Sequence, residues 1–268
     1  MVRGFRQRAG MDFTDTFTTI VKPGTIRAVL QLVVSRAWPV HQLDVSNALL
    51  HGNLDKEVFC QQPTGFVDTD YPDHGMATAY LLLYIDDIIL TASLPALLQQ
   101  ITARLGTEFA LKDLGAPHYF LDIEVVPHAT GFFLYQQKYA CELLERAGML
   151  NCKHASTPID TKAKVCLQMH APRDTHWALV KRILWCINGT MAMGLTLTAS
   201  PNTGLIAYSD ADWAGFPDTR RSTSGYYVYL GPSLISWLSK RQPTVSQSSA
   251  EAEYMAVANT ITECSWLR

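Results

Sequence analysis

The hydrophobic pattern is most distinctive around an acidic pair, Asp86-Asp87. Residues 80–90 are otherwise Leu, Ile and Tyr, which predicts two short buried strands with a turn at the aspartates. Residues 39–45 alternate apolar and polar positions and predict another strand, which ends at Asp44. Hairpins usually turn on Asn-Gly or Asp-Gly because glycine accepts a positive φ. Two adjacent carboxylates are a poor choice for a turn and indicate another role.

Helical periodicity predicts core-facing stripes in four further segments. These lie at residues 26–33, 94–105, 139–147 and 177–187, with Pro95 and Asp174 near helix starts and Gly148 at a helix end. A strand hairpin is predicted at residues 119–126 and 131–135. The pattern therefore predicts an α/β (α+β) chain, with an antiparallel sheet backed by helices.

The C-terminal pattern predicts three strands followed by one helix. The strands are residues 205–210, 225–230 and 234–237. The helix begins at Ser248 or Ser249, and its spacing places Tyr254, Val257, Ala258 and Ile261 on one face. Ser248 and Glu251 have the spacing of a capping box, which gives Glu251 a structural role.

The aspartates predict a metal site when their charges are considered. Two unit charges about 4 Å apart repel by roughly 4 kcal/mol at an effective dielectric constant of 20, and a divalent cation reverses that sign. Asp44 at a strand end beside Asp86 and Asp87 supplies a third carboxylate. Such a set holds two metal ions roughly 3.5–4 Å apart in nucleotidyl transfer. The alternative is an ordinary solvated turn.

Several ordered motifs resemble one family, the Pol polyprotein of copia-type LTR retrotransposons. Tyr84-Ile85-Asp86-Asp87 resembles the Tyr-x-Asp-Asp box of reverse transcriptases, and residues 42–52 resemble the first catalytic motif. Further similar segments are residues 3–7, 21–23, 61–67, 111–115 and 171–177. The resemblance implies a reverse transcriptase palm in which Asp44 and Asp86 are the principal ligands of Mg²⁺, or of Mn²⁺, and Asp87 supports them.

The chain departs from this family at one residue and in its spacing. Leu49 occupies the nucleotide-binding position where the family usually has an aromatic residue under the incoming sugar. The resemblance implies that a few dozen further residues normally separate Asp44 from Asp86. We therefore expect an internal deletion near residues 74–79 and a second gap near residues 162–166, with impaired catalysis.

The last block resembles the start of that family's RNase H domain. It comprises residues 208–215, 218–225 and 248–254. The resemblance implies that Asp210 and Glu253 are catalytic, metal-binding carboxylates, while a solvated helix face is the alternative for Glu253. The family's other two carboxylates lie further downstream, so this part is expected to be inactive alone. We divide the chain into a reverse transcriptase remnant at 1–150, a connection at 151–200 and a partial RNase H-like unit at 201–268.

Charge and cysteine content bound the partners and the compartment. The net charge of -2 argues mildly against tight nucleic-acid binding, but local basic clusters remain. The nucleic-acid-binding candidates are Arg220, Arg221, Lys240 and Arg241, with a solvated loop as the alternative. Six cysteines without a C-x-x-C pair indicate reduced thiols and an intracellular, cytoplasmic protein, in a virus-like particle by family resemblance. Cys166, His170 and His176 lack an evident fourth ligand, so no structural zinc is expected.

These observations lead to one main hypothesis with two alternatives. The chain is interpreted as an RNA-directed DNA polymerase with an RNase H-like C-terminal part, impaired by deletions. Its expected partners are an RNA template, an RNA–DNA hybrid and deoxynucleoside triphosphates, and no membrane is expected because no apolar run is long enough. The alternatives are a non-enzymatic nucleic-acid-binding fragment and an unstable relic.

Overall fold

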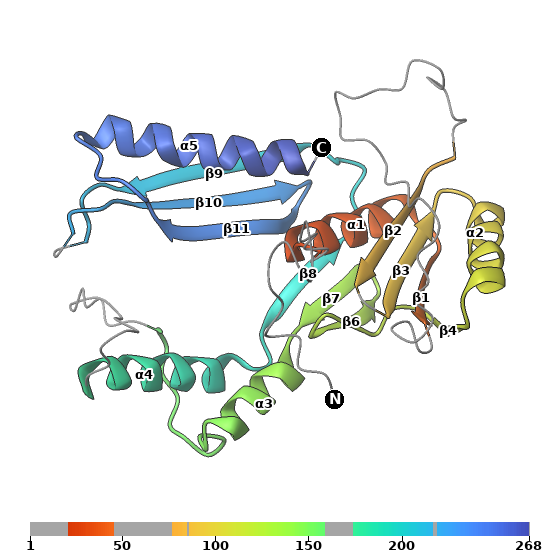
Figure 1. Cartoon of the computed structure of the whole chain (residues 1–268), viewed down its shortest axis with the longest axis horizontal. Coiled ribbons are helices and arrows are strands. Elements are labelled where there is room, and N and C mark those ends of the chain that lie inside the picture. Colours follow the sequence, from red (N-terminus) through yellow and green to blue (C-terminus); the bar gives the residue numbers. More distant parts are fainter. Residues whose placement is uncertain (1–20, 46–76, 85, 159–173, 217–218, 268) are drawn as a thin grey trace, which may run out of the picture.

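The computed structural model describes residues 21–45, 77–84, 86–158, 174–216 and 219–267. These residues form antiparallel sheets and helices, in agreement with the expected α/β (α+β) class. One sheet has three strands and the other two have four strands each. Figure 1 shows the three-stranded sheet with a long helix on one face, beside the other two sheets and a separate pair of helices.

The first sheet has the strand order β2-β3-β1-β4 and contains the predicted acidic hairpin. The hairpin strands are β2 (Ala79–Tyr84) and β3 (Asp87–Ala92), and β3 also pairs with β1 (Val40–Val45), as predicted. The edge strand is β4 (Leu111–Gly115). Helix α2 (Pro95–Glu108) covers one face, where Leu98 joins a cluster around Leu43 and Leu90.

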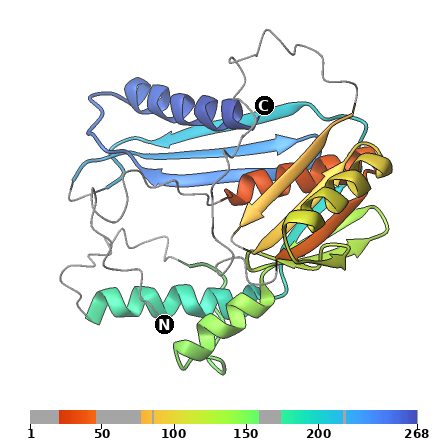
Figure 2. The ribbon, with the colours of Figure 1, turned by 45° about the vertical axis from the view of Figure 1, so that its right-hand side comes forward.

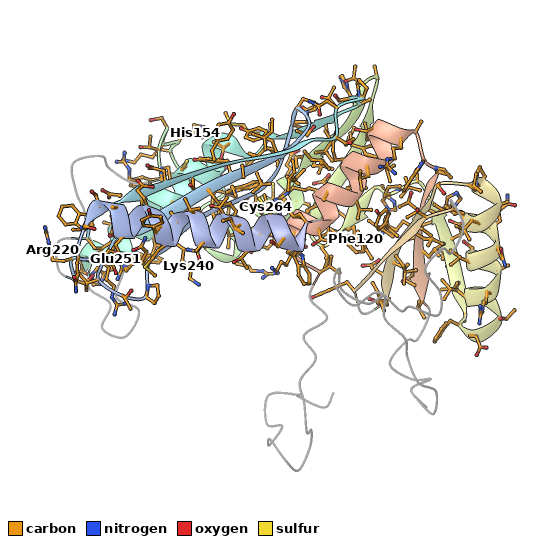
Figure 3. The ribbon with its side chains drawn as sticks, turned by 90° about the horizontal axis from the view of Figure 1, so that it is seen from above. Phe120, His154, Arg220, Lys240, Glu251 and Cys264 are labelled. Carbon is orange, nitrogen blue, oxygen red and sulfur yellow. The ribbon has the colours of Figure 1, made fainter. Side chains whose placement is uncertain are left out.

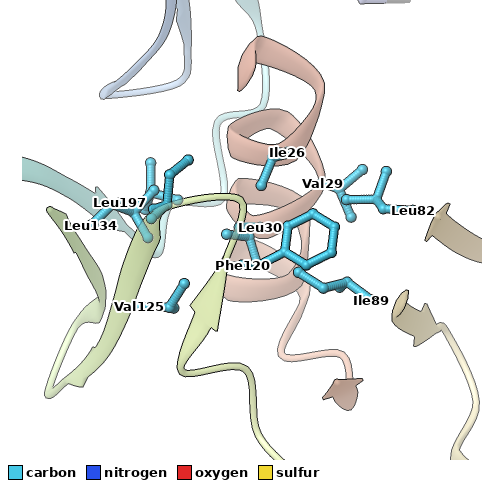
Figure 4. Close-up of a cluster of buried hydrophobic side chains, with 10 residues drawn as sticks. Ile26, Val29, Leu30, Leu82, Ile89, Phe120, Val125, Leu134 and Leu197 are labelled. Atoms are coloured by element: carbon cyan, nitrogen blue, oxygen red, sulfur yellow. The ribbon is translucent and has the colours of Figure 1, made fainter. Parts of the chain in front are cut away.

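The second sheet, β5-β6-β7-β8, shares its core with helix α1. Its strands are β5 (Tyr119–Phe120), β6 (Ile123–His128), β7 (Gly131–Tyr135) and β8 (Gly194–Thr198). Helix α1 (Pro23–Arg36) buries Ile26 and Leu30 against both sheets. Figure 4 shows Phe120 beside Leu30 and Ile89 at this junction. The N-terminal helical stripe is therefore a core face, as predicted.

The predicted continuous strand at 119–126 is wrong. Leu121 and Asp122 have φ values of 51° and 61° and separate β5 from β6. Positive φ at both central residues is the geometry of a type I′ hairpin turn, which usually carries Asn-Gly. Leu-Asp is not a turn signal, so the break could not be found from residue type.

Helices α3 (Gln137–Arg146) and α4 (Asp174–Thr190) pack side by side. The predicted glycine cap is confirmed, because Gly148 has φ 64° and its N–H donates to the Glu145 carbonyl at 2.9 Å. Leu184 is buried as expected. Trp177 is half exposed, so its assignment to the core was wrong.

The third sheet and one helix form the C-terminal unit. The strands are β9 (Leu205–Asp212), β10 (Thr223–Leu230) and β11 (Ser233–Arg241), and α5 (Ser249–Trp266) lies on one face (Figure 1). The predicted cap is confirmed, because the Glu251 N–H donates to Ser248 Oγ at 3.2 Å. Glu251 Oε2 also accepts from the Gln247 N–H at 2.7 Å.

The apolar face predicted for α5 is present, but it faces solvent and not the sheet. The helix buries its small residues Ala252, Ala256 and Thr260, whereas Tyr254 and Ile261 are exposed. Small side chains let the helix approach the sheet closely, and the large residues at the other positions face outward. Hydrophobicity alone pointed to the larger residues.

Helix α1 connects the C-terminal unit to the rest of the chain. Ala28 packs with Tyr226, Val228 and Ile235. Trp266 Nε1 donates to Thr25 Oγ1 at 3.1 Å. Figure 2 shows α1 between the long sheet and the two smaller sheets. The segment predicted as a connection supplies α4 and β8, and β8 pairs with β7. The proposed boundaries at 150 and 200 remain predictions.

Candidate active site

The structure brings Asp44, Asp86 and Asp87 to one end of the first sheet. Asp44 lies directly opposite Asp87 in the antiparallel pair of β1 and β3. The Val45 N–H donates to the Asp86 carbonyl at 2.8 Å, which ties the turn to the end of β1. Asp44 therefore lies next to an acidic pair that is distant from it in sequence.

Burial and neighbouring charges act together on Asp87. Its pKa is raised above the ordinary value, first by burial and then by the Asp86 carboxylate, and a hydrogen bond from Gln42 opposes this rise. Asp44 raises the pKa further. The raised pKa therefore reflects burial first, with repulsion from the two neighbouring carboxylates added to it.

Gln42 is a site residue that the sequence analysis missed. Its side chain is buried, its Nε2 donates to the Tyr119 carbonyl at 2.7 Å, and its Oε1 accepts from the His118 N–H at 3.2 Å. Gln42 therefore joins the acidic end of the sheet to β5. The signal was available, because residues 42 and 44 lie on the same face of a strand.

The donor set suits a hard divalent cation, because carboxylate oxygens are the preferred ligands of Mg²⁺. Among the residues that the structure describes, no three acidic, histidine or cysteine side chains form a ready-made metal cage. The carboxylates have the right chemistry and neighbouring positions, and a cation would draw them closer. Leu49 lies outside the described residues, as do Cys166 and His170 of the zinc alternative.

The second predicted pair is Asp210 and Glu253. Glu253 on α5 accepts a hydrogen bond from the Ala211 N–H at 3.3 Å, so its carboxylate reaches β9. Asp210 pairs with Gly225 on β10. Side chains alternate along a strand, so Asp210 lies on the face opposite Ala211 and α5. The structure brings the Glu253 carboxylate to the backbone of β9 next to Asp210.

A buried polar cluster fixes the start of α5, and sequence reasoning missed it. Gln242 Nε2 donates to Ser224 Oγ at 2.8 Å and to the Ala252 carbonyl at 2.9 Å. Ser246 Oγ donates to Gln242 Oε1 at 2.8 Å. Gln242 thereby links β10, α5 and the loop between β11 and α5. Its contact on α5, Ala252, is the residue before Glu253.

The predicted basic residues gather at the same end of the C-terminal unit. The Arg220 N–H donates to the Phe216 carbonyl at 2.8 Å, and the Arg241 guanidinium lies 3.3 Å from the centre of the Phe216 ring. Arg220 and Arg221 are exposed, as is Lys240 on β11. Figure 3 shows Arg220, Glu251 and Lys240 around the N-terminal half of α5. The cluster is a cationic surface beside Glu253.

An antiparallel sheet with helices and a carboxylate-bearing hairpin is the architecture of a reverse transcriptase-like protein. A family model described as "Reverse transcriptase (RNA-dependent DNA polymerase)" matches residues 1–78 and 71–161. The chain belongs to this family.

The curated relatives identify the branch of the family. The chain is 35% identical over 350 residues to "Retrovirus-related Pol polyprotein from transposon RE2" of Arabidopsis thaliana, covering all of the chain and 24% of that protein. It is 29% identical over 361 residues to the corresponding polyprotein of transposon TNT 1-94 of Nicotiana tabacum, covering all of the chain and 27% of that protein. An uncharacterized mitochondrial protein of Arabidopsis thaliana is 40% identical over 224 residues, covering 70% of the chain and 93% of that protein. These matches confirm the resemblance to a copia-type Pol segment.

The matches can also be compared with the internal deletion that the sequence analysis expects near residues 74–79. The alignment to the RE2 polyprotein runs over 350 positions, whereas the chain has 268 residues, so this relative contains residues that the chain lacks. The two family matches meet at residues 71–78, close to the predicted deletion at 74–79. The chain spans about a quarter of the RE2 polyprotein. Within the described ranges, no helix is both long and apolar enough to cross a membrane.

Proposed function

We propose that this chain carries the metal site of an RNA-directed DNA polymerase and that its catalysis is impaired. The observation that supports the site is the pairing of Asp44 with Asp87 across β1 and β3, with Asp86 next to it in the turn. Reverse transcriptases use divalent metal ions, and the oxygen donors at this tip suit Mg²⁺ or Mn²⁺.

In this proposal, Asp44 and Asp86 hold the cations and Asp87 supports them. Divalent ions held by these carboxylates would supply the chemistry of nucleotidyl transfer, which is activation of a 3′ hydroxyl and stabilisation of the leaving oxygen. Gln42 donates a hydrogen bond to Asp87, and its contacts with β5 keep that carboxylate oriented. The substrates are deoxynucleoside triphosphates and an RNA template in the cytoplasm.

The proposed impairment concerns the chain segment between β1 and β2. Relatives of this chain carry additional residues, and family resemblance assigns template contacts to that segment. Leu49 stands where an aromatic residue would pack under the incoming sugar. The metal site can therefore persist while the positioning of template and nucleotide is weakened.

The C-terminal unit is proposed to be an RNase H-like part with Asp210 and Glu253 as its metal ligands. The arrangement of three antiparallel strands followed by a helix supports this assignment. Two carboxylates are present where family resemblance implies four, which supports weak metal binding and little cleavage of an RNA–DNA hybrid by this part alone.

Primer extension tests the proposal directly. The intact chain is incubated with an RNA template, a DNA primer, nucleotides and Mg²⁺, beside the Asp86→Asn variant. We expect the two proteins to give the same background. Extension by the unaltered chain that disappears with Asp86→Asn would overturn the impairment and support the site.

Metal binding is measured separately, so that loss of activity is not confused with loss of the site. A ligand at ten times its dissociation constant stabilises a protein by about 1.4 kcal/mol, which corresponds to roughly 3–6 °C in melting temperature. We expect Mn²⁺ to stabilise the unaltered chain and the control Asp174→Asn, but not Asp86→Asn. Equal stabilisation of all three proteins would remove the site.

A second candidate function is non-enzymatic binding of an RNA–DNA hybrid, favoured by the basic cluster near α5. Filter binding across a salt series tests it. Each phosphate contact contributes about 0.9 to the salt slope on a duplex, so Arg221→Gln with Lys240→Gln should lower the slope by about 1.8. The matched control is Arg146→Gln, whose side chain is exposed on α3. No affinity at low salt would exclude this function.

A further inference from the structure

A row of aromatic side chains crosses the C-terminal sheet on the face opposite α5. Tyr208 on β9 pairs with Tyr227 on β10, which pairs with Trp237 on β11. Their exposed fractions are 61%, 56% and 44%. Directly paired residues point to the same side of a sheet, so the three rings form one continuous strip. The strip spans about 10 Å, because neighbouring strands are about 4.8 Å apart.

The strip borders an open groove of about 450 Å³. Ile206, Tyr208, Tyr227 and Tyr229 line it, and the turn at Gly231-Pro232 closes one end. The Tyr208 and Tyr229 rings meet edge to face, with centroids 6.2 Å apart. This contact restricts the orientation of the two rings, which favours binding of a planar ligand.

A cation lies at the β11 end of the strip. The Arg27 guanidinium lies 4.1 Å from the centre of the Trp237 ring, and Arg27 Nη1 donates to the Ile235 carbonyl at 3.1 Å. Burial lowers its pKa to about 10, which leaves it charged at neutral pH. Arg27 has no carboxylate within ion-pair distance among the described residues. A half-buried guanidinium without an acidic partner favours an anion from outside the chain.

We propose that this face binds single-stranded nucleic acid. Exposed aromatic rings stack with any base, and a cation beside them holds the phosphate backbone. A paired duplex hides the faces of its bases, so the strip selects unpaired strands. Asp210 lies two residues beyond Tyr208 on β9, on the same face of the sheet. Its negative charge repels phosphates and so directs them toward Arg27. The site is separate from the acidic hairpin and does not depend on polymerase activity.

The test measures fluorescence anisotropy of a labelled oligothymidylate with the intact chain, in low salt and EDTA. An oligouridylate and a duplex of the same length are measured in parallel, and RNA and DNA single strands should both bind. Base stacking on one aromatic side chain is worth a factor of about 5 to 150 in affinity by alanine substitution. We expect Tyr227→Ala to weaken binding by that factor and Tyr227→Phe to retain it. Because no metal is present, binding measured in this test does not depend on the proposed metal site at Asp86.

The matched control is Tyr254→Ala, because Tyr254 is 77% exposed on α5, on the other side of the sheet. Its affinity should equal that of the unaltered chain. Arg27→Gln should lower the salt slope by about 0.7, with melting curves to confirm folding. Equal binding by Tyr227→Ala and Tyr254→Ala would overturn the proposal. Equal affinity for duplex and single strand would also overturn it. Self-association of the chain that Tyr227→Ala abolishes, with no binding of any oligonucleotide, would overturn it as well.

Discussion

Replacing Asp87 by Asn should stabilise the protein without metal. Directly opposed residues of antiparallel strands have Cα atoms about 4.5–5.5 Å apart, and Asp44 is opposed to Asp87. Two charges about 6 Å apart repel by roughly 0.7 kcal/mol in water and about 2.8 kcal/mol at a dielectric constant of 20. Asp86 is exposed and Asp87 is partly exposed, which favours the lower end of this range. We expect a gain of about 0.5–1 kcal/mol, or roughly 1–4 °C in melting temperature.

The effect of this substitution should depend on pH in a defined direction. The folded-state pKa of Asp87 is raised above the ordinary value of 3.8, so folding disfavours its charged form. The penalty is absent below pH 3.8, grows as the pH rises to the folded-state pKa, and stays constant above it. The advantage of Asp87→Asn should therefore be present at pH 7 and vanish near pH 3.

Thermal melts of both proteins, with EDTA and with Mn²⁺, check the reasoning. Without metal, the Asp87→Asn substitution removes repulsion, and the new amide side chain can still interact with Gln42. With Mn²⁺ the order should reverse, because the carboxylate of the unaltered chain becomes a ligand. A variant that melts below the unaltered chain in EDTA at pH 7 would refute the electrostatic interpretation. An advantage that persists unchanged at pH 3 would refute it equally.

Three further changes have defined outcomes. Ala256→Leu should destabilise the protein by about 1–3 kcal/mol because Ala256 is fully buried on the inner side of α5, whereas Ala258→Leu on the exposed side should change the melting temperature little. Gln242→Ala should cost about 1–3 kcal/mol in urea unfolding, because it leaves the Ala252 carbonyl and Ser224 without their buried donor. Burial acts to raise the pKa of Asp113, but hydrogen bonds from Gly115 and His41 outweigh it and lower that pKa below 3.8. Asp113→Asn should therefore lose stability at pH 7, and the difference in melting temperature should disappear as the pH falls through the lowered pKa.

The hairpin could be predicted because its signals are local. Apolar runs on both sides of Asp86-Asp87 fix two strands, and alternation in 39–45 fixes the face of Asp44. Pairing between these strands followed from the requirement to bury both runs in one sheet. The spacing of Gln42 and Asp44 already indicated a shared face, but Gln42 was missed because its partners His118 and Tyr119 become known only from the fold.

Two failures came from tertiary packing. At Leu121 and Asp122 the backbone adopts positive φ although neither residue type favours a type I′ turn, so the surrounding sheet must impose it. On α5, Ala252 and Ala256 are buried because the helix lies close to the strands. Periodicity placed Tyr254 and Ile261 together correctly, but it could not tell which face meets the sheet.

Helix α1 explains how a chain with a missing segment can keep a core. One side of the helix packs Ile26 and Leu30 with Leu82, Phe120 and Leu197, which come from both sides of the predicted deletion and from the predicted connection. Its other side packs Ala28 against Tyr226 and Val228. These contacts of α1 join the parts of the described chain in shared cores. Family resemblance assigns template contacts to the segment that we propose is deleted, so we expect this shared core to form even where the positioning of substrates is weakened.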